Sequence, residues 1–333
     1  MDSLFAYRRA GDTAIHSHSG DCLEGLLEGG FALGTFDGRM YTIRPEEKLP
    51  FDRLNETLEF LAGKETGMYY MPYRSTTRET YDDGLDRIIG TLADNEKTVY
   101  SRVITRRGNL DAEASFKSLC EAYPDAFVFC VSTPDTGTWL GATPEILLQG
   151  DGTDSFRTMA LAGTRKRGTT EPWDEKNIVE QRIVADYIAD ILDSHCLEYE
   201  ASETIVRPAG PIEHLCRDFL ISGLHPADRE SFREFISDLY PTPALCGFPK
   251  ENAMRMILDT ERHVRGLYGG FCGPLDGYRS DLNVVLRSVR FRPDRLAMFT
   301  GGGITEASEP DEEWLETECK AASILSKLTF SKQ

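Results

Sequence analysis

Some ionisable residues of this chain stand where their neighbours are apolar. Lys97 opens the strand-like stretch KTVYSR, and Glu145 stands between Pro144 and the apolar run ILL. A lysine and a glutamate shielded from water could act as a base and an acid, because burial favours the neutral form of each. Each residue taken alone is more often an ordinary solvated charge. The pair therefore indicates a catalytic site only together with the other segments of the chain.

Carboxylates on two predicted helices could bind a metal ion. Glu180 lies inside one helical stretch, and Glu316 and Lys320 lie four residues apart, hence on one face of another. Mg²⁺ prefers hard oxygen ligands and takes few protein carboxylates, so water and substrate oxygens complete its shell. Judged by local sequence alone, Glu316 and Lys320 would instead form a surface pair contributing about 0.3–0.5 kcal/mol.

Short segments rich in β-branched and aromatic residues predict the strands that must position these side chains. These strand-like segments span residues 31–43, 97–104, 126–132, 138–149, 156–163, 283–291 and 295–303. The segment ending at residue 303 includes TGGGI, a glycine-rich turn that lets the backbone approach a ligand closely.

Helices are predicted between these strands. They span residues 51–61, 110–123 and 173–196, and a C-terminal helix begins near Pro310 with acidic residues in its first turn. In the helix over 173–196, helical spacing groups Ile178, Ile183, Tyr187, Ile188 and Leu192 on one face. Strands in meanders interrupted by helices predict an α+β fold with mostly antiparallel sheet.

The composition narrows the class of protein. A hydrophobic fraction of 40% is typical of a globular chain, and no apolar run approaches the roughly 20 residues that span a bilayer. The N-terminus, MDSLFAYRRAGD, shows no signal peptide, so we expect a cytoplasmic protein without a membrane partner. The net charge of −18 argues against nucleic acid as a partner, because neutralising phosphates requires a basic face.

Ten short segments, taken together, resemble the chorismate-binding enzyme family. In chain order they are KTVYSR, GATPEILL, ALAGTRKRG, DEKNIVEQRIV, EHL, LYPTPALCGFPK, RGLYGG, VVLRS, GGGI and EEWLETECK. Each segment alone is weak evidence for the family, but ten segments in this order and spacing are very specific evidence for it. The resemblance covers roughly Thr91 to the C-terminus, whereas the first ninety or so residues match poorly and are shorter than the family's usual N-terminal half.

This resemblance implies a fold and a domain organisation. We expect a single chorismate-binding domain over residues 1–333, with a short N-terminal part over 1–90 and a catalytic core over 91–333. The implied architecture is the anthranilate synthase component I-like fold, an α+β sandwich of mostly antiparallel sheets with helices packed outside. Members of the family suggest a monomer.

The resemblance also implies a magnesium site and a substrate pocket. Glu180 and Glu316 match the family's Mg²⁺ ligands, and Glu313, one turn earlier, could hold a metal-bound water. Asn177 replaces an additional glutamate found in many relatives. The residues matching substrate-binding positions are Thr164, His214, Ala244, Leu245, Tyr268, Arg287, Gly301, Gly303 and Lys320. Among these, Tyr268 and Arg287 match positions that bind the pyruvyl carboxylate of chorismate, and His214 matches a histidine near the leaving or arriving group.

Within the family, Lys97 and Glu145 match the catalytic base and acid of isochorismate synthases. Lys97 would activate water for attack at C2 of chorismate, and Glu145 would protonate the hydroxyl that leaves C4. The lysine must then be neutral part of the time and the glutamate protonated. Relatives that use ammonia generally lack this lysine and often have glutamine, so Lys97 favours water as the nucleophile.

Two alternatives remain open at this point. A salicylate synthase would make isochorismate and then eliminate pyruvate in the same site, although Ala244 and Leu245 resemble isochorismate synthases. A catalytically degenerate member would bind chorismate or a partner without turnover. The pathway is also open among the menaquinone, siderophore and salicylate routes, and the DEKN-type helix favours menaquinone.

Overall fold

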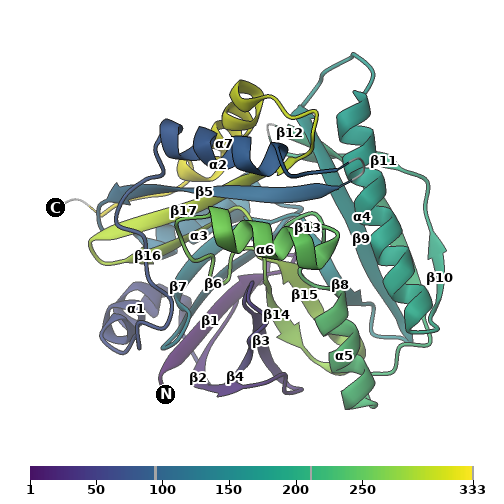
Figure 1. Cartoon of the computed structure of the whole chain (residues 1–333). Coiled ribbons are helices and arrows are strands. Elements are labelled where there is room, and N and C mark those ends of the chain that lie inside the picture. The colour runs from purple at the N-terminus through teal and green to yellow at the C-terminus, as the bar shows by residue number, and fades with distance from the viewer. Residues whose placement is uncertain (94–95, 211, 332–333) are drawn as a thin grey trace.

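The computed structural model describes residues 1–93, 96–210 and 212–331 (Figure 1). Residues 94–95, 211 and 332–333, which fall within the expected catalytic core, lie outside the described residues. Runs of consecutive strands are separated by helices along the chain, and every strand pairing in the described part is antiparallel. The predicted α+β class with mostly antiparallel sheet is therefore confirmed.

Seventeen strands join in one hydrogen-bonded network within the described residues. They are β1 (Ser3–Arg8), β2 (His16–Glu24), β3 (Gly30–Gly34), β4 (Met40–Lys48), β5 (Lys97–Arg107), β6 (Phe127–Thr133), β7 (Gly137–Thr143), β8 (Ile146–Gly150), β9 (Ser155–Lys166), β10 (Glu198–Ala201), β11 (Ile205–Ala209), β12 (Ile212–Ser222), β13 (Gly247–Phe248), β14 (Phe271–Leu275), β15 (Asp281–Val284), β16 (Ser288–Arg292) and β17 (Arg295–Ile304). The N-terminal strands belong to the same network, because β1 pairs with β6 and β3 pairs with β14.

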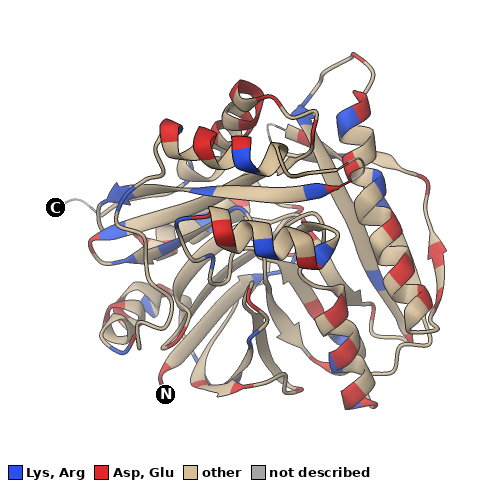
Figure 2. Cartoon of the chain, in the orientation of Figure 1, with Lys and Arg blue, Asp and Glu red and all other residues tan. Residues whose placement is uncertain are grey.

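The helices lie on the outside of the strands (Figure 1). They are α1 (Leu54–Ala62), α2 (Arg78–Ile89), α3 (Ala112–Ala122), α4 (Glu175–Ser194), α5 (Arg229–Leu239), α6 (Lys250–Thr260) and α7 (Pro310–Leu325), with 3-10 turns η1 (Phe51–Arg53) and η2 (Gly277–Arg279). Acidic side chains are spread over α2, α4, α5 and α7, so much of the negative charge lies on the outer helices (Figure 2). None of the helices in the described residues combines the length and apolarity needed to cross a bilayer.

Alternating side chains fill two separate cores. Along β6, Phe127, Phe129 and Val131 point into the larger core, which also takes apolar residues of α4 and α5. Val128 and Cys130 point the other way, into a second core that α1, α3 and α7 cover. This alternation is expected when both faces of a strand are buried.

The four predicted helices are confirmed, with small shifts in their bounds. Asp174 caps α4, because its side chain accepts a hydrogen bond from the backbone N–H of Asn177. One predicted core position is wrong: Ile178 is 43% exposed, since it lies in the first turn of α4, before the helix packs fully against β9 and β12. The sequence did not predict α2, α5 or α6.

Three predicted strands are each broken in the structure, because the segment 31–43 forms the β3–β4 hairpin and two further segments are interrupted near the site. The segment 138–149 divides into β7 and β8 around Pro144 and Glu145, and 283–291 divides into β15 and β16 around Arg287. The breaks face each other, because β7 pairs with β16 while β8 pairs with β15. Proline cannot donate a ladder hydrogen bond, and Arg287 has a left-handed φ of 49°, so neither site can continue a regular strand.

Candidate active site

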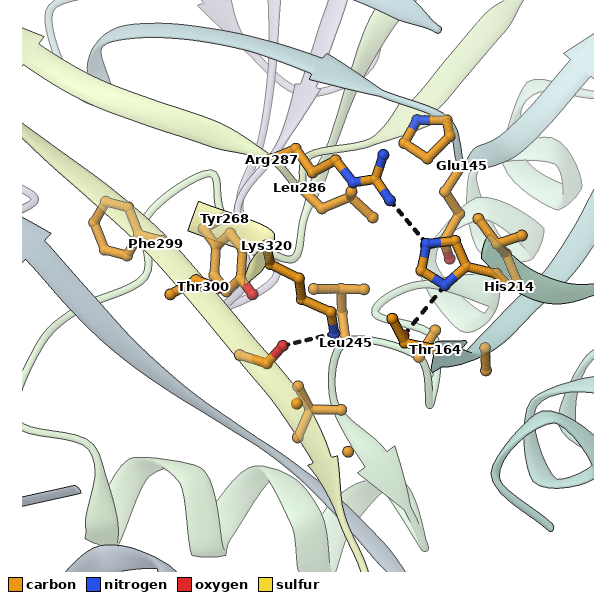
Figure 3. Close-up of a pocket in the computed structure, with 18 of the residues that line it drawn as sticks. Glu145, Thr164, His214, Leu245, Tyr268, Leu286, Arg287, Phe299, Thr300 and Lys320 are labelled. Carbon is orange, nitrogen blue, oxygen red and sulfur yellow. Dashed lines mark hydrogen bonds between the residues drawn. The ribbon is translucent and has the colours of Figure 1, made fainter. Parts of the chain in front are cut away.

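A cavity lies where β9, β12 and β17 meet α7 and the turn before β13 (Figure 3). The sequence-predicted residues that line the cavity are Glu145, Thr164, Glu180, His214, Ala244, Leu245, Tyr268, Arg287, Gly301, Gly303 and Lys320. The structure thus brings together side chains that lie far apart in the sequence.

Lys97 lies beside this cavity as the first residue of β5. Its side chain is fully buried, and its Nζ lies 2.9 Å from Oε1 of Glu180, which comes from α4. This contact is an ion pair rather than a well-oriented hydrogen bond. β5 pairs with β17 so that Val99 is opposite Gly303, and a Cβ on Gly303 would lie 2.6 Å from Cε of Lys97. Glycine at 303 therefore makes room for the lysine and the carboxylate.

Glu145 occupies the break between β7 and β8. It is 2% exposed, and its Oε1 has no hydrogen-bond partner among the described residues. Burial raises the pKa of this carboxyl to about 8, although Lys97 and Arg287 act in the opposite direction. The carboxyl is therefore largely protonated near neutral pH, which is the form that a general acid requires.

Three glutamates surround the glycines of β17, and each is paired with a lysine. Glu180 pairs with Lys97, Lys320 Nζ lies 2.6 Å from Oε1 of Glu316, and Lys176 donates to Oε1 of Glu313. A Cβ on Gly302 would lie 2.8 Å from Oε2 of Glu313 and 3.5 Å from Oε1 of Glu316. Within the described residues, no three histidine, cysteine, aspartate or glutamate side chains form a ready metal-binding group.

Lys176 is a residue of this region that sequence reasoning missed. Burial disfavours its charge, but Glu313 and Glu180 outweigh that effect and raise the pKa of Lys176 to about 12. Lys176 lies in the first turn of α4, where the positive end of the helix dipole disfavours a cation. An unfavourably placed lysine at the start of a helix could have indicated, from the sequence alone, that a carboxylate of another element pairs with it.

Arg287 occupies the break between β15 and β16. It is 7% exposed, and its side-chain hydrogen bonds within the described residues go to His214 and Ala209 rather than to a carboxylate. Its Nη2 lies 2.8 Å from Nε2 of His214, and its Nη1 donates to the carbonyl of Ala209 at 3.3 Å. Figure 3 shows Arg287 pointing across the cavity at His214. Burial lowers the pKa of this arginine to about 10, which leaves it charged at neutral pH.

The remaining predicted residues form the walls. Lys320 Nζ donates to the carbonyl of Gly301 at 3.0 Å, and Tyr268 stacks on Phe299 with ring centroids 5.7 Å apart. Sequence reasoning did not single out several further lining residues, which are Val99, Leu161, Leu286, Phe299 and Thr300. Alternation along the predicted strand over 295–303 could have identified Phe299, because it shares a face with the glycines at 301 and 303.

These features define a class of site. A protonated carboxyl and a lysine lie at one cavity, where acid–base chemistry needs both kinds of group. A buried arginine without a carboxylate partner favours an anionic ligand. The fold and site together define an α+β protein whose cavity suits acid–base chemistry on a small anionic ligand.

Comparisons with known proteins identify the family. The family model described as chorismate binding enzyme matches residues 74–329. The chain belongs to this family, as the ten ordered segments indicated. It is 32% identical to a chloroplastic isochorismate synthase of Catharanthus roseus over 266 residues, which cover 74% of this chain and 45% of that protein.

Solved structures of the family share the fold. The menaquinone-specific isochorismate synthase from Escherichia coli matches with a TM-score of 0.74 and 21% identity, covering 98% of this chain and 88% of that one. Anthranilate synthase component I from Streptococcus pneumoniae matches with a TM-score of 0.67 and 14% identity, covering 96% and 89%. The chain spans about half the length of the curated relatives it matches.

Proposed function

We propose that this protein is an isochorismate synthase, which isomerises chorismate by adding water at C2 and releasing the C4 hydroxyl as water. The observation that supports this most strongly is a buried, protonated Glu145 at the same cavity beside which Lys97 lies buried, paired with Glu180. The curated relatives named isochorismate synthase, at about 30% identity, support the same reaction. We favour the menaquinone pathway because of the DEKN-type start of α4.

In the proposed reaction, two groups of this chain move protons. Lys97 accepts a proton from the attacking water, and Glu145 donates its proton to the departing hydroxyl, so one water enters and one leaves. Arg287 binds a carboxylate of the substrate, because its guanidinium is buried without a carboxylate of the protein. A single chain supplies all of these residues, which is compatible with an enzyme that acts as a monomer. We propose that this enzyme is cytoplasmic.

We also propose that Glu180 and Glu316 hold Mg²⁺, with Glu313 placed to bind a water on it. The donor set fits, because these are hard carboxylate oxygens and Oε2 of Glu313 is buried with no hydrogen-bond partner in the described residues. A magnesium ion, when bound, would neutralise negative charge on the substrate. Magnesium bound by Glu180 and Glu316 would replace the ion pairs that these carboxylates make with Lys97 and Lys320, and Lys97 released from Glu180 would more easily adopt the neutral form that a base requires.

The product of the reaction provides the test of the proposed function. Purified protein with chorismate and magnesium is expected to form isochorismate, and EDTA is expected to prevent this. Chromatography against isochorismate, salicylate and anthranilate standards identifies the product. Salicylate with pyruvate would replace the proposal with a salicylate synthase. Absence of any product, with or without ammonia, would support a catalytically degenerate chorismate-binding protein.

The Glu316→Gln variant tests the metal site. Loss of one carboxylate ligand is expected to weaken Mg²⁺ binding by at least roughly tenfold, because the amide oxygen is an uncharged and poorer ligand. Isothermal titration calorimetry with MgCl₂ measures this directly, without turnover. Glu312→Gln, on an exposed position of the same helix, is the matched control. Equal magnesium affinity of Glu316→Gln and the wild type would remove Glu316 from the proposed ligand set.

A further inference from the structure

The contact between Arg287 and His214 fixes the form of the histidine. Nη2 of Arg287 lies 2.8 Å from Nε2 of His214, and a guanidinium can only donate hydrogen bonds. Nε2 must therefore present its lone pair. Nδ1 of the same ring lies 2.9 Å from the carbonyl oxygen of Gly163, which can only accept, so Nδ1 must have the proton. One form satisfies both contacts, which is the neutral imidazole protonated on Nδ1.

The surroundings of His214 disfavour its positive form. The ring is 7% exposed, and burial together with the charges of Arg287 and Lys320 lowers its pKa well below the ordinary value. The other titratable side chains lining the cavity are Glu145, Glu180, Tyr268, Arg287 and Lys320. A protonated Nε2 would also direct an N–H at the N–H of Arg287, and that clash would break the contact between them.

Arg287 needs such an acceptor. It is a buried cation held in a left-handed backbone conformation, and its side chain reaches two acceptors in the described residues, His214 Nε2 and the carbonyl of Ala209. A carboxylate at position 214 would satisfy the arginine but would also cancel its charge. A neutral imidazole orients the guanidinium and leaves the full positive charge for an anionic ligand.

We propose that His214 is a positioning residue, a permanently neutral acceptor that aims Arg287 at a carboxylate of the substrate and exchanges no proton during the reaction. The identity of that carboxylate rests on the proposed function. Thr164 completes the arrangement, because its hydroxyl lies 3.2 Å from Nδ1 on the side opposite Arg287. His214 therefore acts through Arg287 rather than on the reacting atoms.

Nitrogen-15 NMR of histidine-labelled protein tests the form of the ring without any turnover. The His214 signals, assigned by their loss in His214→Gln, are expected to show a neutral ring protonated on Nδ1 from about pH 6 to about pH 8. His225, on the exposed turn before α5, provides the reference signal of a solvent-exposed ring. Detection of the Nε2-protonated form or of imidazolium at His214 overturns the proposal even if chorismate proves not to be the substrate.

Two variants then separate positioning from proton transfer. Glutamine at 214 keeps an acceptor oxygen but cannot relay a proton, whereas methionine has a similar size and no comparable acceptor. His214→Met is expected to raise KM for chorismate by roughly 10- to 100-fold, and His214→Gln is expected to recover most of that loss with kcat reduced less than about tenfold. Abolished kcat in both variants, with the thermal unfolding of each unchanged, would instead identify His214 as a proton donor or acceptor.

Discussion

The Lys97→Gln variant is expected to lose turnover by about 100- to 10,000-fold, the usual contribution of a positioned general base. Glutamine can still donate a hydrogen bond to Glu180 but cannot accept a proton from water. The neighbouring strands should keep their arrangement, because glutamine is no larger than lysine in a position that is already fully buried. Steady-state kinetics of chorismate consumption measure the loss.

A matched control accompanies this variant. Lys117→Gln removes the same charge from an exposed position of α3, and it is expected to keep wild-type turnover. Chorismate binding by Lys97→Gln, followed by calorimetry, should remain measurable if the cavity is intact. Turnover by Lys97→Gln at the wild-type rate would disprove the assignment of Lys97 as the base.

The Glu145→Gln variant is expected to show a comparable loss of turnover, because an amide cannot protonate the leaving hydroxyl. The wild type should also lose kcat as the pH rises through about 8, since the carboxyl then gives up the proton that the reaction needs. A pH series of kcat for the wild type, beside the exposed control Glu121→Gln, measures both effects. A wild-type rate that is flat from neutral pH to about pH 9 would contradict the role of Glu145.

Burial of Glu145 also predicts how stability depends on pH. The folded protein holds this proton up to about pH 8, whereas the unfolded chain releases it near pH 4.5. Between these values the folded state binds more protons, so its free energy of unfolding falls as the pH rises. Glu145→Gln removes this term and should be more stable than the wild type at pH 9 by on the order of 3–5 kcal/mol, with little difference at pH 4. Urea unfolding at both pH values measures the difference.

Much of the fold followed from local sequence patterns, but three breaks in the predicted strands did not, and two of these position the site. Residues 138–149 and 283–291 each have the composition of one continuous strand, and the structure divides both. The breaks arise from pairing between distant segments, since β7 with β16 and β8 with β15 form two separate ladders. Glu145 and Arg287 lie at these two breaks, where their side chains leave the regular sheet and enter the cavity.

The candidate site was predictable because ten sequence segments occur in the order typical of the family. The residue types at any one position were not sufficient to predict it. Local sequence alone predicts that Glu180 and Glu316 are solvent-exposed helix residues. Only the family resemblance predicted that they lie at one site. The pairing of Lys176 with Glu313 joins residues far apart in the sequence, so no periodicity could reveal it. The protonation of Glu145 was also hidden, because it depends on burial by side chains from many elements.

The pairing of β5 with β17 has a consequence for how the protein is made. Lys97 is synthesised well before residues 295–304, so its strand can pair with β17 only after those residues have left the ribosome, and α7 follows later still. Until then β5 presents an unpaired edge, which is the kind of surface that chaperones protect from aggregation. The nascent chain therefore cannot bind substrate in a complete cavity until β17 and α7 have been made.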